Sequence, residues 1–240
     1  MPKEKFLSLY EVLKNNICKN KYPDGMLPPE NQLVNEFKCS RNTIRRSIAR
    51  LNDEGYVQSL KGKGVVILEP LELKRECFQL DFKSFAWVSS LVMNNKANLT
   101  TSVLSFEKSI IDENSKKITG FQVGVEVYHL VRIRYLDNEP LLLDINYFRS
   151  DIVSDLTVSI AQNSIYDYIK NVLNKKILAA RRTIAIKKAT KQDKALINLK
   201  DHDCVGILYN NAYVEDGRIF EYTESHFVPD RFVFSQFVQN

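Results

Sequence analysis

Basic side chains gather in residues 38–63, whose sequence is KCSRNTIRRSIARLNDEGYVQSLKGK. Only two carboxylates, Asp53 and Glu54, accompany seven basic groups in this segment. The basic residues are Lys38, Arg41, Arg45, Arg46, Arg50, Lys61 and Lys63. A local excess of positive charge attracts the phosphate backbone of a nucleic acid. The segment predicts double-stranded DNA as a partner, although charge content alone leaves a solvated basic helix as the alternative.

A second set of polar residues in the later part of the chain has the side-chain types of an anion site. Arg132 and Arg134 are two residues apart in a strand-like run, so both project to one face. A serine begins each of two expected helices, where hydroxyls and free backbone amides can hold a phosphate. Two carboxylates lie in strand-like runs that are otherwise apolar. These four residues are Ser84, Ser164, Asp144 and Glu221. Taken singly, each is more often a surface ion pair or a helix cap than part of an anion site.

The net positive charge of the chain is confined to its first third. Residues 1–75 hold 14 Lys or Arg against 9 Asp or Glu, while residues 76–240 hold 20 of each. The 240-residue length and this asymmetry favour two domains with different partners. We expect a DNA-binding domain over residues 1–69, a linker over 70–77 and a second domain over 78–240. The chain has no long uncharged apolar run and no signal-peptide pattern, so a cytoplasmic protein is expected.

Cysteine and histidine offer little material for a catalytic or metal centre. The four cysteines are far apart, and only three histidines occur, at 129, 202 and 226. Neither a disulfide framework nor a zinc site is predicted, and we expect reduced, mostly buried thiols. No nucleophile with a base and no metal cluster is visible, so no catalytic residue, metal or cofactor is predicted.

The elements that position the basic residues follow from apolar spacing. Phe6 to Ile17 repeat apolar residues at helical intervals, which predicts a helix over about residues 5–20. A second helix follows Pro28-Pro29-Glu30, and a third begins after Ser40 as its N-cap. Ile44, Ile48 and Leu51 form the buried stripe of the third helix, so its arginines face outward. Such a helix can enter a major groove.

The run after the third helix predicts a hairpin with a positively charged tip. Gly55 ends the helix, a β-rich run begins at Tyr56, and the turn Lys61-Gly62-Lys63-Gly64 precedes a second strand over residues 65–68. A glycine turn with lysines is common in soluble hairpins. Its place directly after a basic helix makes it a candidate wing.

These residues resemble the N-terminal winged helix-turn-helix domain of the GntR family of bacterial transcription regulators. The matching motifs are Gly25-x-Leu27-Pro28-x-Glu30, Leu33, Phe37, Ser40-Arg41-x-Thr43-Ile44-Arg45, Leu51, Glu54-Gly55 and Gly62-Lys63-Gly64. The resemblance implies DNA contacts by Arg41, Thr43, Arg45 and the wing from Gly62 to Gly64, to which the basic side chains of Arg46 and Lys61 add. Pro29 departs from the family, in which a serine more often caps the second helix.

Strand-like runs dominate the remainder of the chain. They cover residues 102–111, 125–136, 141–148, 178–187, 205–214, 219–228 and 232–238. Asp137-Asn138 and Asp216-Gly217 are expected hairpin turns. Helices are expected from Ser84 over about ten residues, over 164–173 and over 190–198. The pattern predicts an α+β protein, a winged helix followed by a mixed α/β domain with a mainly antiparallel sheet.

Short motifs in this remainder resemble the UTRA domain of the HutC subfamily of GntR regulators, whose fold is similar to chorismate lyase. They are Phe82-Lys83-Ser84-Phe85, Arg132-x-Arg134 with Pro140 and Asp144, Asn163-Ser164-Ile165-Tyr166, Glu221-Tyr222 and Asp230-Arg231-Phe232. The motifs Leu143-Asp144-x-x-Tyr147-Phe148, Asn163-Ser164-Ile165-Tyr166-x-Tyr168-Ile169 and Tyr222-Thr223-Glu224-Ser225 resemble in particular members that respond to trehalose 6-phosphate. The resemblance implies this sugar phosphate as effector, its phosphate held by the amides of Ser84 and Phe85 with Arg132, Arg134, Ser164 and Tyr166. Asp144 and Glu221 would accept sugar hydroxyls.

The expected function is a homodimeric repressor that leaves a palindromic operator when the sugar phosphate binds. Another sugar phosphate, such as an amino-sugar phosphate, is the alternative effector, and an enzyme with a lyase-like second domain is the competing class. Arg132 and Arg134 share a face, so which of them contacts the ligand stays open.

Overall fold

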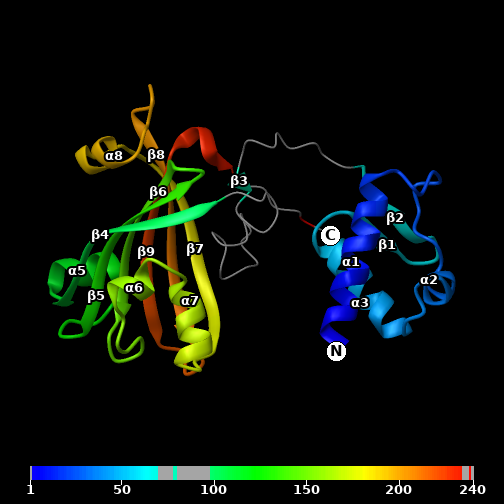
Figure 1. The fold of residues 1–240 in the computed structure, drawn as a ribbon, viewed down its shortest axis with the longest axis horizontal. Helices are drawn as coiled ribbons and strands as arrows, with labels where there is room; N and C mark the ends of the chain where they lie inside the picture. The colour runs from blue at the N-terminus through cyan, green and yellow to red at the C-terminus, as the bar shows by residue number, and fades with distance from the viewer. Residues whose placement is uncertain (1, 70–77, 80–97, 234–237, 239–240) are drawn as a thin grey trace. The chain divides into compact units, whose positions relative to one another are not determined.

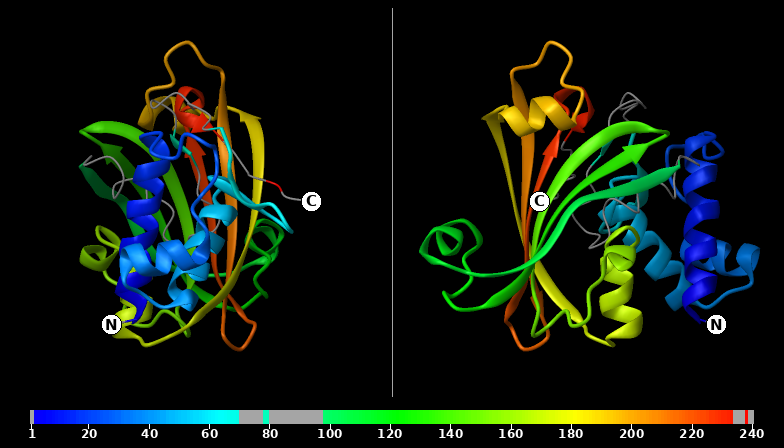
Figure 2. Two further views of the ribbon diagram at one scale, coloured as in Figure 1. Left: turned by 90° about the vertical axis from the view of Figure 1, so that its right-hand side faces the viewer. Right: turned by 60° about the vertical axis from the view of Figure 1, so that its left-hand side comes forward.

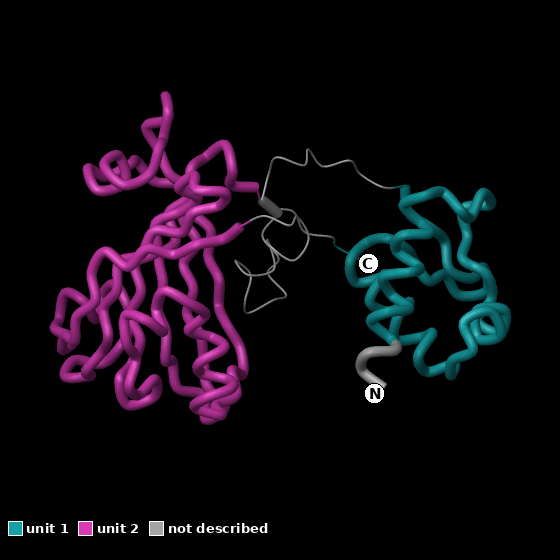
Figure 3. The backbone as a smooth tube through the Cα atoms, in the orientation of Figure 1, with its two compact units in different colours: residues 1–75, 235–240 teal, residues 76–234 magenta. Residues whose placement is uncertain are grey.

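A computed structural model describes residues 2–69, 78–79, 98–233 and 238. The chain divides into two compact units, one of residues 1–75 with 235–240 and the other of residues 76–234 (Figure 3). The expected linker over 70–77 and the expected helix from Ser84 lie outside the described residues. The domain boundaries at 69 and 78 stay a prediction. No helix within the described ranges is long and apolar enough to cross a membrane.

The first unit is a three-helix domain with a hairpin. It contains α1 (Pro2–Cys18), α2 (Glu30–Phe37), α3 (Arg41–Asp53), β1 (Val57–Leu60) and β2 (Gly64–Ile67) (Figure 1). Its core joins α1, α2 and α3 through Leu13, Leu33 and Ile44, each fully buried. These elements confirm the winged helix-turn-helix predicted from the sequence.

Local geometry explains where these helices begin and end. The Ser40 side chain accepts a hydrogen bond from the Thr43 amide at 3.2 Å, which is the predicted N-cap of α3. Gly55 has a φ of +79°, a conformation that favours glycine after a helix. Pro29 precedes α2 without any side-chain cap, so its departure from the family leaves the first turn of α2 uncapped by a side chain.

The second unit is built on a six-stranded, fully antiparallel sheet in the order β4-β5-β6-β9-β8-β7. The strands are β4 (Leu99–Ile110), β5 (Glu126–Leu136), β6 (Glu139–Arg149), β7 (Ile177–Lys188), β8 (Cys204–Val214) and β9 (Ile219–Phe227). Positive φ angles at Asp137 and Asn138 close the β5–β6 hairpin, and Gly217 with φ +82° closes the β8–β9 hairpin. Both predicted turns are therefore present. Two short strands, β3 (Phe78–Gln79) and β10 (Phe232–Val233), pair in parallel.

Short helices connect the long strands. They are α5 (Glu113–Thr119), α6 (Val158–Ala161), α7 (Ile165–Asp167), the π-helix η1 (Tyr168–Val172), α8 (Lys191–Leu196) and the 3₁₀ turn η2 (Pro229–Arg231). The helix predicted over 164–173 is present, as three α-helical residues that pass into a π-helix. Helices α5 and α6 were not predicted from the sequence. A capping box between Asp112 and Ser115 starts α5, and the Thr157 side chain caps α6.

The two faces of the sheet are covered by different segments. Residues Ile165 and Ile169 of the α7–η1 segment pack with Leu130 and Phe148 on one face. Figure 2 shows α5 and the α6–α7 segment on opposite sides of the sheet. Because side chains alternate along a strand, even-numbered positions of β5, β6 and β8 face the α6–α7 segment. Polar residues at such positions are therefore brought under these helices.

The expected burial of the cysteines is wrong for those that the structure describes. Cys18 is exposed, and Cys39 and Cys204 are half-buried; none of these three described cysteines forms a disulfide. Cys18 follows the buried stripe of α1 by one position and so points away from the core. Cys77 lies outside the described residues.

Candidate anion pocket and nucleic-acid interface

The start of α3 carries the predicted DNA-contacting residues on its exposed side. Burial of Ile44, Ile48 and Leu51 leaves Arg41 and Arg45 exposed. The Thr43 hydroxyl, in the first turn of the helix, lies 2.9 Å from the hydroxyl of Ser40. The helix thus presents two cations and a hydroxyl at its N-terminal end, where recognition helices contact base edges.

Acidic and aromatic neighbours already hold some of these cations. Arg45 Nε lies 3.0 Å from both carboxylate oxygens of Glu30, and this pairing raises the pKa of Arg45. The Arg46 guanidinium instead stacks 4.3 Å from the ring centroid of Phe6 in α1. Arg45 can exchange one exposed carboxylate for a phosphate or a base, whereas the position of Arg46 is set by an aromatic contact.

The wing presents Lys61 and Lys63, both exposed, on a turn that requires glycine. Gly62 and Gly64 have φ angles of +79° and +103°, which side chains disfavour. A Cβ at Gly64 would also approach the side chain of Met26 to 3.1 Å. The glycines therefore set the shape of the tip, and the lysines supply its charge.

A cavity of about 230 Å³ lies in the second unit between the sheet and residues 162–166. Six of the residues predicted to bind the effector line this one cavity. They are Arg132, Arg134, Asp144, Ser164, Tyr166 and Glu221. The remaining two selected residues, Ser84 and Phe85, lie outside the described residues.

The two arginines of the cavity differ in exposure. Arg132 is 3% exposed; its Nε donates to Asn146 Oδ1 at 2.8 Å and its Nη1 to the Ala161 carbonyl at 3.1 Å. Burial, followed by the nearby charge of Arg134, lowers the pKa of Arg132 to about 10, so it stays charged at neutral pH. Arg134 donates from Nε to Asp144 at 2.7 Å and keeps an 18% exposed side chain. Both line the cavity, and Arg134 has more of its surface open to a ligand.

The two carboxylates of the cavity are buried and hydrogen bonded. Asp144 accepts from Arg134 and from the hydroxyl of Ser225. Glu221 accepts from the Tyr166 hydroxyl, from the Thr223 hydroxyl at 2.6 Å and from Asn210 Nδ2 at 3.1 Å. Burial raises the pKa of Glu221, while the bonds from Thr223 and Tyr166 oppose that rise. Burial and the neighbouring Glu221 together raise the pKa of Tyr166, so its hydroxyl keeps its proton.

Four further buried polar residues of the cavity were not predicted from the sequence. They are Asn146, Asn210, Thr223 and Ser225, each at most 6% exposed. Asn146 is two positions from Asp144, and Thr223 and Ser225 continue the same period from Glu221. Polar residues at every second position of an otherwise apolar strand are the signal that could have identified three of them. Asn210 has the apolar residues Leu208 and Ala212 two positions away on its face of β8 and carries no such signal.

This set of side chains provides cationic donors and anionic acceptors within one cavity. The arginines suit a phosphate or carboxylate, and the carboxylates suit groups that donate hydrogen bonds. Within the described ranges, no group of three His, Cys, Asp or Glu residues could hold a metal ion.

Comparisons with known proteins agree with both halves of this description. The family described as the UTRA domain matches residues 95–233, and the one described as bacterial regulatory proteins, gntR family, matches residues 6–67. The HTH-type transcriptional regulator TreR of Bacillus subtilis is 29% identical over 240 residues, covering 100% of this chain and 99% of that protein.

Two solved structures have the same folds. The effector binding domain of the B. subtilis trehalose repressor has 31% identity and a TM-score of 0.54, over 59% of this chain and 98% of its own. The possible transcriptional regulator YydK of B. subtilis has 17% identity and a TM-score of 0.77, over 98% of this chain and 99% of its own. The second likeness supports the fold of the whole chain.

Proposed function

Because the chain belongs to the GntR family and carries a UTRA domain of the HutC subfamily, we propose that trehalose 6-phosphate releases it from operator DNA. As a member of this family it is a transcription regulator and not an enzyme, with a DNA-binding winged helix and an effector-binding domain. The proposal concerns the identity of the effector and the residues that contact each ligand.

The observation that supports this proposal most is that arginines and carboxylates line the same cavity. Arg134 and Ser164 would bind the phosphate, with Arg132 adding its charge from behind. Glu221 and Asp144 would accept hydroxyls of the sugar. A ligand with a dianionic end and a hydroxyl-rich end matches both requirements, and the similarity to the trehalose repressor supports trehalose as the sugar.

On DNA, we infer a homodimer that reads a palindromic operator. Two copies of α3 on a two-fold axis would contact half-sites about one helical turn apart. Arg41, Thr43 and Arg45 would face bases or phosphates, and the wing from Lys61 to Gly64 would follow the backbone. The effector releases DNA only if it binds more tightly to an arrangement of the dimer that no longer fits the operator.

A thermal unfolding series on the full chain tests the choice of effector. Trehalose 6-phosphate, glucosamine 6-phosphate, glucose 6-phosphate and inorganic phosphate are compared at equal concentration. A ligand at 100 times its Kd stabilises the folded state by about 2.7 kcal/mol, so the tightest ligand gives the largest rise in Tm. Trehalose 6-phosphate is expected to give it. A larger rise with glucosamine 6-phosphate would favour the amino-sugar alternative, and no rise with any sugar phosphate would contradict the proposal.

A further inference from the structure

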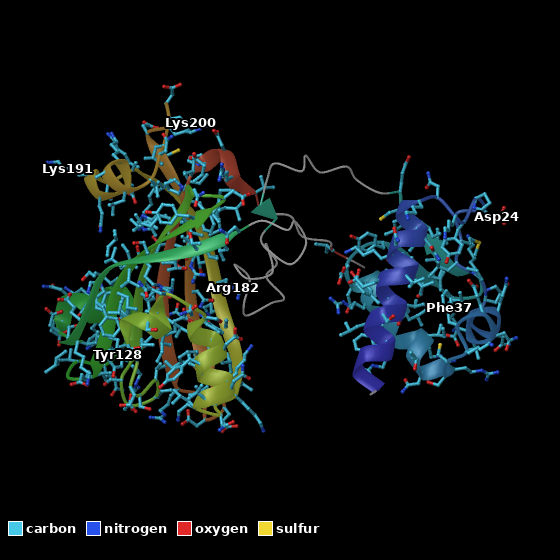
Figure 4. All side chains as sticks on the ribbon, in the orientation of Figure 1. Asp24, Phe37, Tyr128, Arg182, Lys191 and Lys200 are labelled. Atoms are coloured by element: carbon cyan, nitrogen blue, oxygen red, sulfur yellow. The ribbon has the colours of Figure 1, made fainter. Side chains whose placement is uncertain are left out.

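Hydrogen-bonded side chains form a continuous line across the sheet beneath the cavity, buried except at its half-buried end, Arg182. The line enters from β5 on one side and from the edge strand β7 on the other, and both arms end on Glu221. Figure 4 shows the side chains on the strands and labels Arg182, which begins the β7 arm. Most of its members lie outside the residues that the proposed phosphate contacts require.

The first arm starts at Arg132 of β5. Arg132 Nε donates to Asn146 Oδ1 at 2.8 Å, and Asn146 Nδ2 is 2.8 Å from Thr223 Oγ1. The Thr223 hydroxyl then donates to Glu221 Oε1 at 2.6 Å. Asn146 and Thr223 are direct partners in the β6–β9 register, so the backbone itself sets this contact.

The second arm starts at Arg182 of β7. Arg182 Nε donates to Asn210 Oδ1 at 3.1 Å, and Asn210 Nδ2 donates to Glu221 Oε2 at 3.1 Å. Arg182 and Asn210 are direct partners in the β7–β8 register. The Tyr166 hydroxyl reaches the same Oε2 atom from α7.

The direction of every bond in the line is fixed by its two ends. A guanidinium has only donors, so each asparagine must turn its oxygen toward its arginine and its NH₂ group inward. Thr223 accepts from Asn146 and therefore gives its own proton to Glu221. Three donors consequently meet the Glu221 carboxylate, which has about four lone-pair directions.

Because the line is largely buried, reversing the donor and acceptor directions of its hydrogen bonds would cost free energy. Asn146, Asn210, Thr223 and Glu221 are between 1% and 6% exposed, so the loss of a hydrogen-bond partner costs more free energy here than at the surface. A protonated Glu221 would carry its proton in the one direction that the three donors leave open, and it would accept their hydrogen bonds more weakly than the ionised group does. The line thus favours the ionised carboxylate against the effect of burial.

We propose that this line makes Glu221 an acceptor-only carboxylate with one open direction, so that the pocket selects a ligand bearing a hydroxyl or ammonium donor there. Arg182, Asn146, Asn210 and Thr223 are positioning residues that act through Glu221. This inference rests on the effector role proposed for the cavity and adds the rule by which the cavity chooses its ligand.

The line also predicts how binding depends on pH. The titratable and charged groups facing Glu221 are Arg132 and Arg134 from β5, Asp144 from β6, Tyr166 from α7 and, through Asn210, Arg182 from β7. Removing one donor leaves the other charges in place and raises the pKa of Glu221 further, because the ionised form loses a hydrogen bond. Ligand binding by such a variant should weaken as pH falls through this raised pKa.

A titration without ligand tests the line directly. The carboxyl carbon of Glu221 is followed by NMR in the ¹³C-glutamate-labelled full chain, its signal assigned by its loss in Glu221→Gln. Thr223→Val removes the hydroxyl with little change of volume, and Thr223→Ser keeps the hydroxyl as the matched control. The midpoint should move to higher pH in the valine variant and stay in the serine variant. Equal midpoints in all three proteins would overturn the proposal.

Ligand binding measured by calorimetry then tests the role of the line separately from the identity of the effector. Trehalose 6-phosphate should bind about tenfold more weakly to Thr223→Val and to Asn210→Leu, as for one hydrogen bond to a charged group. Arg182→Met should produce a smaller loss of the same kind, and inorganic phosphate should bind all variants as it binds the wild type. Equal losses for both ligands would overturn the positioning role. If the wild type binds no sugar phosphate, the effector proposal fails, while the ligand-free titration still decides the role of the line.

Discussion

The two units hold their arginines in opposite ways. Arg45 of the winged helix is 67% exposed and pairs with one exposed carboxylate, that of Glu30. Arg132 of the sheet domain is 3% exposed and is held by Asn146, Ala161 and Asp144. An exposed pair contributes little to stability and exchanges partners readily, whereas a buried charge is costly once a partner is removed.

This difference suits two kinds of anion. A DNA-reading surface has to slide and compare sequences, so exposed cations with replaceable partners are suitable. A small-molecule pocket gains affinity from side chains whose positions are fixed before the ligand arrives. The difference also explains why the surplus positive charge lies in the first 75 residues, while the arginines of the second unit are balanced by carboxylates.

The largest expected effect is a loss of stability when a buried ion-pair partner is removed. Asp144→Ala would leave Arg132, Arg134 and Ser225 without their shared acceptor. We expect the free energy of unfolding of the second unit to fall by about 3–5 kcal/mol, the usual cost of breaking a buried ion pair. Urea unfolding of the full chain measures it. Glu30→Ala, which breaks the exposed pair, is the matched control and should leave unfolding unchanged; equal losses would remove the contrast between the units.

The next effect concerns effector binding alone. Arg134→Ala should weaken trehalose 6-phosphate binding about 100-fold, because a charged, partly exposed phosphate donor is lost. Operator affinity without effector should not change. Calorimetry and gel shifts measure the two quantities, with Arg149→Ala, which removes an arginine outside the cavity, as control. Loss of DNA binding in both Arg132→Ala and Arg134→Ala would indicate a structural role for these arginines instead.

A smaller effect is expected at the recognition helix. Arg45→Ala should weaken operator binding about tenfold while random DNA is bound nearly as before, as for a residue that reads a base. Gel shifts at one fixed salt concentration measure both affinities. Arg46→Ala provides the comparison, since this guanidinium stacks on Phe6 and should matter less. An equal loss on operator and random DNA would make Arg45 a phosphate contact only.

The smallest expected effect is a pH dependence of stability on the other face of the sheet. His226 Nδ1 lies 2.7 Å from Asp193, and Nε2 lies 3.3 Å from Glu224. Burial opposes the charge of His226, yet the bonds to Glu224 and Asp193 outweigh it and raise its pKa above 6.5. Stabilisation by a raised pKa is complete below the unfolded value and is lost as pH rises through the folded one. The Tm should therefore fall above pH 6.5, and His226→Gln should flatten that fall; an unchanged slope would contradict this role.

The sequence predicted elements whose patterns are local. The buried stripe of Ile44, Ile48 and Leu51 was enough to orient α3, and Ser40 was enough to mark its start. Strand-like runs and turn residues gave the antiparallel sheet. The short helices α5 and α6 depend on single caps, and η1 follows a local change of hydrogen bonding that residue types do not show.

The candidate pocket was predicted in part, for a similar reason. Arg132, Arg134, Asp144 and Glu221 could be selected because charge is unusual in an apolar strand. Their partners depend on strand register, which pairs Asn146 with Thr223 and Arg182 with Asn210. Register is a relation between distant segments, so no single run of sequence contained it. Arg46 was selected by its charge, and its contact with Phe6 depends on how α1 packs against α3.

One titration tests the central claim that separate sets of arginines serve two kinds of phosphate. Fluorescence anisotropy follows a labelled operator, selected by the protein from random DNA, as trehalose 6-phosphate is added to the wild type, Arg134→Ala and Arg45→Ala. We expect the effector to release the wild type from the operator. Arg134→Ala should start with the same operator affinity as the wild type and stay bound when the effector is added. Arg45→Ala should bind the operator weakly even before the effector is added. Release of Arg134→Ala at the same effector concentration as the wild type, or no release of the wild type, would contradict the claim.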